Sequence, residues 1–317
     1  MIMVLVFALQ LALPLLLIGW TGFAPARSAL GFCIQAIAVA AALFAVGLTG
    51  LWLIPPWWAA WVFGALLLAA FVRGWRRRSP FASPLPSGTV AWLSTAVFAG
   101  ICSWGVVQSA SALAGRALQP GMVVDLAFPL RGGEYLVVNG GSTISINAHR
   151  MTLDAGVARF RAYRGQSYGV DIVKLGRWGL RADGVLPPQP GAYEIYGVPV
   201  YAPCAGDVIA AQDGLRDMQV PQPDRDHMAG NHLLLRCKQA DVLLGHLKPG
   251  SSKVAIGQWV STGQPVANVG NSGNTGEPHL HIHAQMPGTA TEPFSGNPLA
   301  VRFDGRFLVR NDRFAIP

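Results

Sequence analysis

The first acidic residue of this chain is Asp125, and up to residue 116 the only charged side chains are six arginines. Four apolar segments lie in this part of the chain, at residues 1–20, 29–54, 57–72 and 90 to about 110. Each is near the ~20 residues that a helix needs to cross a bilayer. A water-soluble helical bundle would need polar faces, which these segments lack. The sequence therefore predicts an N-terminal α-helical transmembrane region of about four spans.

The arginines predict how this region is oriented. Arg73, Arg76, Arg77 and Arg78 fall between the third and fourth segments, and Arg27 falls between the first and second. Basic residues are enriched in cytoplasmic loops of membrane proteins. We therefore expect both loops in the cytoplasm and everything after about residue 110 on the other side. The first segment lacks the basic start of a cleaved signal peptide, so we expect it to be retained.

The formal net charge of +8 does not indicate nucleic-acid binding. Six positive charges lie at or before residue 116, and the remaining 18 basic residues against 16 acidic ones leave only +2. The high isoelectric point therefore reflects the membrane region, whose partner is the lipid bilayer.

The second half changes to short β-like segments separated by Gly, Pro and Asn, which predicts an all-β domain. We expect a helical anchor at 1–116, a connector and small β region at 117–164, and the main β domain at 165–317. The expected strands are 134–138, 143–146, 167–173, 198–202, 206–210, 232–236, 241–247, 254–259, 265–269 and 279–284. Asn139-Gly140-Gly141 is typical of a hairpin turn after the first of them.

Three histidines alternate with two aliphatic residues in His279-Leu280-His281-Ile282-His283. In a strand, alternate side chains point to opposite faces, so the histidines share one face and the aliphatics face a core. Neutral imidazole is a common zinc ligand. All seven histidines lie at or after position 149, so we expect any metal chemistry in the second half.

Cys204 and Cys237 fall on or beside expected strands, whereas Cys33 and Cys102 fall in apolar segments. A compartment outside the cytoplasm permits a disulfide between the first two, and two buried thiols are the alternative. Spacing alone does not decide between them.

The order of motifs over residues 165–285 resembles the M23 family of zinc metallopeptidases, the lysostaphin-like peptidoglycan endopeptidases. The motifs are Tyr168-Gly169-Val170-Asp171, Gly197–Ala202 with Gly206-Asp207-Val208, Gly230–Leu235, Gly245-His246-Leu247, and the stretch from Asn274 to His281. The resemblance implies a lysostaphin-like antiparallel sheet and a bound Zn²⁺. It implies that Asp171 and His281 are metal ligands, and that His246 and His279 assist catalysis.

One position departs from the family pattern. The family's first metal ligand is usually a histidine four residues before the aspartate, and here that position is Ser167. A serine hydroxyl is a poor zinc ligand. His149, in Asn147-Ala148-His149, is our preferred replacement. Some branches of the family look as if they carry such an Asn-x-His pattern before a Tyr-x-x-Asp motif. His283, on the same strand face as His281, is a second candidate, and a domain without tight zinc binding is the third outcome.

The apolar segments and the resemblance together imply a metalloendopeptidase of the bacterial inner membrane, with its peptidase domain on the periplasmic or extracellular side. The substrate that the resemblance implies is the cross-link or stem peptide of peptidoglycan. The alternative is a catalytically inactive module that binds cell wall or regulates another hydrolase. A channel or transporter is disfavoured, because no charged residue lies inside the apolar segments.

Overall fold

A computed structural model describes residues 8–77, 83–238, 240–289 and 291–317 of the chain. Its contacts divide the chain between Ala114 and Gly115 into a helical unit and a β unit. The segment 117–164 contributes strands to the large sheet of the β unit. The three-part division predicted from the sequence stays a prediction.

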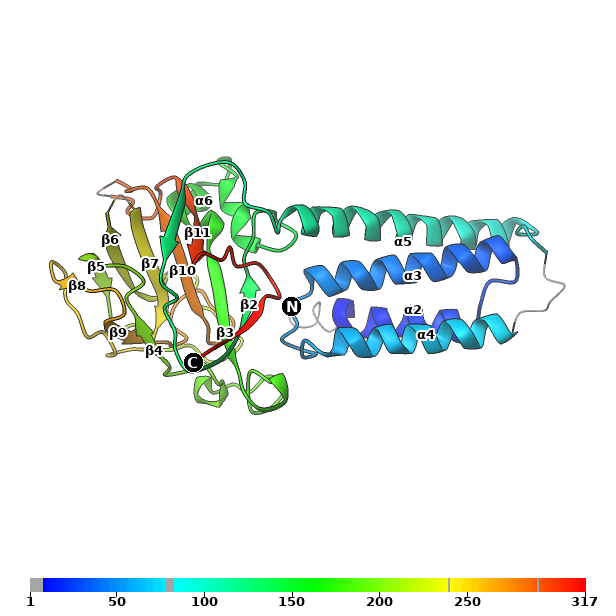
Figure 1. Ribbon diagram of the computed structural model, residues 1–317, viewed down its shortest axis with the longest axis horizontal. Helices are drawn as coiled ribbons and strands as arrows, with labels where there is room; N and C mark the ends of the chain where they lie inside the picture. The colour runs from blue at the N-terminus through cyan, green and yellow to red at the C-terminus, as the bar shows by residue number, and fades with distance from the viewer. Residues whose placement is uncertain (1–7, 78–82, 239, 290) are drawn as a thin grey trace. The chain divides into compact units, whose positions relative to one another are not determined.

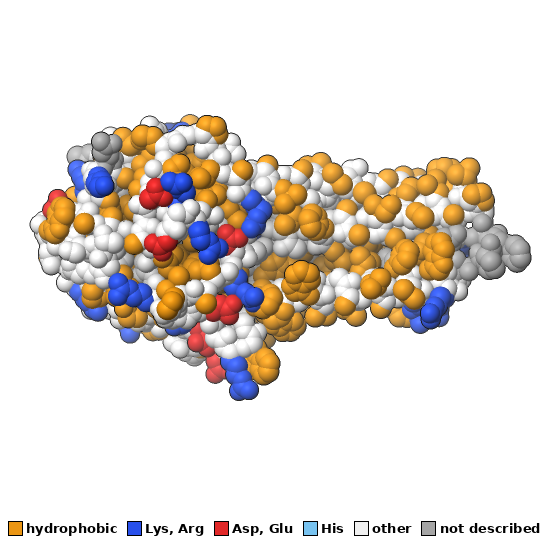
Figure 2. Space-filling model, in the orientation of Figure 1, with side chains coloured by type: hydrophobic (Ala, Val, Ile, Leu, Met, Phe, Trp, Pro, Cys, Tyr) orange, Lys and Arg blue, Asp and Glu red, His pale blue; other side chains and the backbone are white. Residues whose placement is uncertain are grey.

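The helical unit contains a short π-helical turn followed by four α-helices. Helix α3 packs along α5, and α2 packs along α4 (Figure 1). Hydrophobic side chains cover the visible face of this unit (Figure 2), as in a surface that faces lipid. The helices are η1 (Ala8–Ala12), α2 (Leu13–Phe23), α3 (Ala29–Thr49), α4 (Ala59–Arg77) and α5 (Thr89–Ala114).

Among the described residues, three helices are long and apolar enough to cross a membrane, namely α3, α4 and α5. The first predicted span corresponds to the shorter apolar helix Ala8–Phe23, and its residues 1–7 lie outside the described part of the chain. Arg78 also lies outside it, whereas Arg76 and Arg77 form the last turn of α4. The structure thus supports three candidate spans, and the fourth stays a prediction.

The β unit is built on a ten-stranded sheet in the order β12-β2-β3-β10-β7-β6-β5-β8, with β11 joining β10 and β1 joining β11. All of its pairings are antiparallel except that of β1 with β11. Two further strands, β4 and β9, pair separately. The strands are β1 (Val123–Leu126), β2 (Gly133–Asn139), β3 (Val170–Leu175), β4 (Pro199–Tyr201), β5 (Gly206–Gln212), β6 (Asn231–Cys237), β7 (Ala240–Leu247), β8 (Trp259–Val260), β9 (Pro265–Asn268), β10 (Leu280–Gln285), β11 (Pro298–Phe303) and β12 (Arg313–Ile316).

Some strand predictions were wrong. Residues 143–146 form turns, because Asn139-Gly140-Gly141 leads into a loop and the 3-10 helix η2 (Ala148–Leu153) instead of a hairpin. The strand expected at 254–259 is reduced to Trp259–Val260. Strands β1, β11 and β12 were not predicted. The remaining expected strands are present, with ends shifted by a few residues.

Strand β10 lies near the centre of the sheet, between β3 and β7 (Figure 1). Leu280 and Ile282 are fully buried in the main hydrophobic core, with Ile172 of β3 and Leu244 of β7. The three histidines of β10 and its entry turn line a pocket on the opposite face. The predicted alternation is therefore confirmed, and the sheet separates a core from a row of imidazoles.

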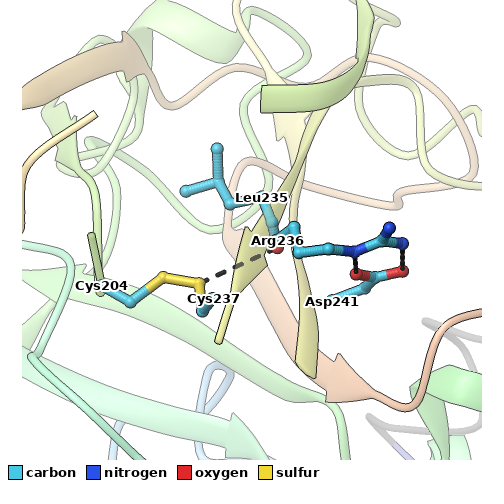
Figure 3. The surroundings of a disulfide bond; sticks show 5 residues. All are labelled: Cys204, Leu235, Arg236, Cys237 and Asp241. Atoms are coloured by element: carbon cyan, nitrogen blue, oxygen red, sulfur yellow. Dashed lines mark hydrogen bonds and ion pairs between the residues drawn. A yellow bond between two sulfur atoms is a disulfide. The ribbon is translucent and has the colours of Figure 1, made fainter. Parts of the chain in front are cut away.

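Cys204 and Cys237 form a disulfide bond (Figure 3). It joins the segment before β5 to the end of β6, and Cys237 is buried in the main core. Next to it, Arg236 makes a two-point ion pair with Asp241 across the β6–β7 turn (Figure 3). The sequence left open either a disulfide or two buried thiols, and the structure contains the disulfide.

Candidate metal centre

Asp171 and His281 face each other across two neighbouring strands. They are direct partners in the antiparallel register of β3 and β10, so their side chains leave the same face of the sheet. Nδ1 of His281 lies 2.8 Å from Oδ1 of Asp171, and both residues are buried. Strand pairing alone therefore fixes this half of the candidate centre.

His149 completes the group from outside the strands. It lies in η2, where the Asn147 side chain caps the helix by accepting a hydrogen bond from the His149 backbone N–H at 3.1 Å. Nε2 of His149 lies 2.9 Å from Oδ2 of Asp171. Gly169 makes room for the two rings, since a Cβ there would lie 2.7 Å from His281 Cε1 and 3.1 Å from His149 Cδ2.

One donor atom from each of His149, Asp171 and His281 lies within 4.8 Å of the others. Two imidazoles and one carboxylate suit zinc, whose catalytic sites use three protein ligands and keep one position open. The space that Gly169 leaves between the two rings also fits such a group. These residues could hold a metal ion through His149 Nε2, His281 Nδ1 and the Asp171 carboxylate. The structure thus brings together the three predicted ligands, and their role as ligands stays a prediction.

Ser167 stands where the family usually has a histidine, and it has another contact. Its fully buried hydroxyl lies 2.8 Å from Thr152 Oγ1, and Thr152 in turn donates to the carbonyl of His149 at 2.8 Å. Ser167 therefore helps to fix the helix that presents His149.

A buried chain of hydrogen bonds, which the sequence did not reveal, orients Asp171. Asn139 donates from Nδ2 to Asp171 Oδ2 at 2.8 Å, and Arg310 donates from Nη2 to Asn139 Oδ1 at 2.5 Å. Arg310 also donates from Nε to the Val138 carbonyl, and only 8% of its surface is exposed. Partners of this kind orient a ligating carboxylate. Arg310 is one of four arginines between residues 302 and 313, so no signal in the sequence singled it out.

His246 reaches the pocket because β7 carries a β-bulge. Two residues of β7, Gly245 and His246, lie opposite the single residue His232 of β6. Val242 and Leu244 point into the core, so regular alternation would send His246 there as well. The bulge, with His246 at a left-handed φ of 59°, turns its side chain to the pocket instead.

His246 and His279 lie side by side, with ring centroids 4.7 Å apart. Nδ1 of His246 donates to the Ser272 carbonyl at 2.9 Å, and Nδ1 of His279 donates to the Glu277 carbonyl at 2.9 Å. A carbonyl only accepts, so each neutral ring carries its proton on Nδ1 and leaves Nε2 as an acceptor. Nε2 of His279 lies 3.6 Å from Asp171 Oδ1.

The segment that carries His279 is anchored by an ion pair. Arg181, which is 5% exposed, donates from Nε and Nη2 to both carboxylate oxygens of Glu277 at 2.9 Å. Two parallel charge-assisted bonds hold a planar carboxylate in one orientation. The ion pair therefore fixes Glu277, whose backbone carbonyl accepts the hydrogen bond from His279 Nδ1.

His283 lies behind His281. Its Nδ1 is 2.9 Å from Nε2 of His281, so the two nitrogens of His281 face Asp171 and His283 respectively. Nε2 of His283 is buried without a hydrogen-bond partner among the described residues. His283 is outside the group of three candidate ligands, and it contacts the far side of one of them.

Five of the seven histidines line a single pocket of about 390 Å³, together with Asp171. The other two are elsewhere: His227 is exposed and pairs with Asp224, and His232 packs on Phe294. The loop before β6 contributes Arg225, Met228 and Ala229 to the lining.

Burial controls the protonation of these histidines. It lowers the pKa of His246 and His283 well below the usual value, and the neighbouring imidazoles lower it further. Burial also lowers the pKa of His281, against the opposing effect of Asp171. For Asp171, burial raises the pKa, but His149, His279 and His281 together outweigh it and hold the pKa well below the usual range. At neutral pH Asp171 is therefore an ionised carboxylate, and the rings of His246, His281 and His283 are neutral.

We expect the chelator-treated protein to lose stability as the pH falls below about 6.5. His246, His281 and His283 have lowered pKa values in the folded state, so below the usual value of 6.5 the unfolded chain binds more protons. Each such histidine costs at most about 1.4 kcal/mol per pH unit. Thermal unfolding between pH 7.5 and 5.5 measures this loss. His283→Leu, which removes one of the three, should show a shallower slope, and equal slopes would contradict the explanation.

Residues 193–293 match the model of Peptidase family M23. The chain therefore carries a segment of the M23 peptidase family, at residues 193–293. The match includes His246, His279 and His281, and the predicted ligands His149 and Asp171 precede it. No curated protein sequence matches the chain.

Several solved structures resemble part of this chain. The catalytic domain of lysostaphin from Staphylococcus simulans aligns at 20% identity over 40% of this chain and 71% of that one, with a TM-score of 0.26. A zinc-containing peptidase from Vibrio cholerae aligns at 20% identity over 37% of this chain and 46% of that one, with a TM-score of 0.23. A putative M23 peptidase from Pseudomonas aeruginosa aligns at 23% identity over 33% and 43%, with a TM-score of 0.23. This chain thus covers less than half the length of the last two proteins.

Proposed function

We propose that this protein is a membrane-anchored zinc metallopeptidase that hydrolyses cross-links or stem peptides of peptidoglycan. The observation that carries the proposal is the convergence of His149, Asp171 and His281 next to the paired rings of His246 and His279. The match of residues 193–293 to peptidase family M23 supports the substrate class. His149, Asp171 and His281 are the proposed metal ligands.

When bound at these residues, zinc would supply Lewis-acid chemistry that polarises the scissile carbonyl and activates water. His246 and His279 are the proposed catalytic residues, because each directs an unprotonated Nε2 away from its anchoring carbonyl. One can accept a proton from the attacking water, and the other can stabilise the developing oxyanion once protonated. The left-handed backbone at His246 is a further feature of functional sites.

The membrane region supports a location outside the cytoplasm for the M23 domain. The basic end of α4, at Arg76 and Arg77, lies on the segment before α5, and α5 leads directly to Gly115 at the start of the β unit. If that basic end is cytoplasmic, α5 carries the M23 domain to the opposite side. Peptidoglycan lies on that side of a bacterial inner membrane, in the periplasm or at the cell surface.

The proposal is tested by incubating the detergent-purified full-length protein with isolated peptidoglycan and measuring the soluble peptides released. We expect release that a chelator stops and added zinc restores. His279→Ala should lower the rate at least about 100-fold, as for loss of a general acid or base. His227→Ala, which changes an exposed histidine outside the pocket, should leave the rate unchanged. Zinc-loaded protein that binds peptidoglycan and releases nothing would support the inactive binding module instead.

A further inference from the structure

Arg159 and Arg225 line the same pocket as the five histidines. They come from separate segments: Arg159 belongs to the short helix α6 (Ala158–Ala162), and Arg225 belongs to the loop that joins β5 to β6. Both side chains are exposed. Two arginines that solvent reaches therefore line the same pocket as the candidate metal ligands, which are half-buried or buried.

The positive charge of these arginines is not balanced within the pocket. Among the described residues that line it, Asp171 is the only one with a carboxylate. Its oxygens already contact His149, His281 and Asn139. A metal ion held there would add further positive charge.

The arginines themselves have no ion pair in the described part of the chain. Nη2 of Arg159 contacts the thioether sulfur of Met228 at 3.7 Å, and that group carries no charge. Asp224, next to Arg225, accepts hydrogen bonds from His227 and from the backbone of Asp226. Neither Asp224 nor Asp226 lines the pocket.

We infer that Arg159 and Arg225 form a subsite for a free carboxylate close to the scissile amide of the substrate. The inference rests on the peptidase function proposed above and narrows its substrate to anionic peptides. Guanidinium groups bind carboxylates through two parallel, charge-assisted hydrogen bonds. An unbalanced positive charge at a pocket also increases the rate of encounter with anions.

The wall next to Arg159 suits the remainder of such a peptide. Tyr163 and Phe294 stack with ring centroids 5.9 Å apart, and both line the pocket. Their faces offer apolar surface to the aliphatic part of a side chain whose carboxylate reaches the arginines. The subsite therefore joins a charged anchor to an apolar contact, which is typical of a pocket that selects its ligand.

The test measures binding separately from hydrolysis. Soluble peptidoglycan fragments, either untreated or with their carboxylates converted to carboxamides, are titrated calorimetrically into the zinc-loaded full-length His246→Ala variant. We expect the untreated fragments to bind about 10-fold more tightly. In that background Arg159→Gln and Arg225→Gln should each weaken binding of the untreated fragments several-fold and leave binding of the amidated ones unchanged. Arg216→Gln, an exposed arginine of the same loop that does not line the pocket, is the matched control.

Two results would overturn the inference. The first is that the His246→Ala variant binds untreated and amidated fragments equally, or binds neither. The second is that both glutamine variants keep the preference for fragments with free carboxylates. If the preference depends on the two arginines but the wild-type protein releases no peptides, the carboxylate subsite stands and the proposed hydrolysis fails. The two proposals can therefore fail separately.

Discussion

Replacing His149 with alanine is expected to weaken zinc binding by the full-length protein at least about 100-fold and to stop peptide release. His149 supplies the Nε2 atom that lies 2.9 Å from Asp171, and the candidate group would fall from three donors to two without it. Loss of a residue that only hydrogen-bonds to a ligand typically costs about 10- to 100-fold in metal affinity, so loss of a ligand itself should cost no less. Zinc content after dialysis, with chelator competition for the dissociation constant, measures the effect.

Three variants separate the alternatives for the third ligand. His281→Ala should lose zinc as His149→Ala does, and His227→Ala should keep about one zinc per chain. His283→Ala should weaken binding less than His149→Ala, because His283 contacts the far nitrogen of His281 and not Asp171. If His149→Ala binds zinc as the wild type does and His283→Ala does not, His283 is the third ligand and our assignment is wrong.

Replacing both Cys204 and Cys237 with serine is expected to destabilise the β unit by roughly 3–4 kcal/mol. The bridge closes a loop with a sequence separation of 33 residues, and its removal gives the unfolded chain the freedom of that loop. The bridge also ties the segment before β5 to the end of β6, where Cys237 is buried in the core. For a unit of this size the midpoint of thermal unfolding should fall by roughly 10 °C.

The matched control is Cys33→Ser, which changes an exposed cysteine of α3 and should not shift the unfolding of the β unit. Thiol alkylation of protein made in bacterial membranes gives a second measurement. We expect the modification of Cys204 and Cys237 only after reduction, since a disulfide persists where the domain lies outside the reducing cytoplasm. Free thiols at both positions would contradict the bridge and the proposed orientation together.

Part of the fold and of the site could be predicted because the information lies in short stretches of sequence. The alternation from His279 to His283 assigns the histidines to one face of a strand and the aliphatic residues to the other. This holds wherever the strand lies in the sheet. The acid-free apolar segments similarly predict membrane helices from composition and length. In both cases the physical cause, side-chain direction or hydrophobic length, acts over a few consecutive residues.

The strand predictions failed where local signals competed with contacts from distant parts of the chain. Asn139-Gly140-Gly141 reads as a hairpin turn, but Asn139 binds Asp171 and Arg310 instead of closing one. Strand β12 pairs with β2, which lies more than 170 residues earlier, and β1 pairs with β11. Such pairings leave no periodic signal of their own in a single sequence.

The sequence by itself determined the apolar character of the first 116 residues, the strand that carries the histidines, and its two faces. Only the tertiary structure decided which groups meet at that strand. His149 approaches Asp171 from a helix 22 residues earlier, Arg310 supports it from beyond β11, and a bulge turns His246 out of the core. Periodicity is a property of neighbouring residues, whereas a metal centre depends on donors whose distances are set by the packing of the whole sheet.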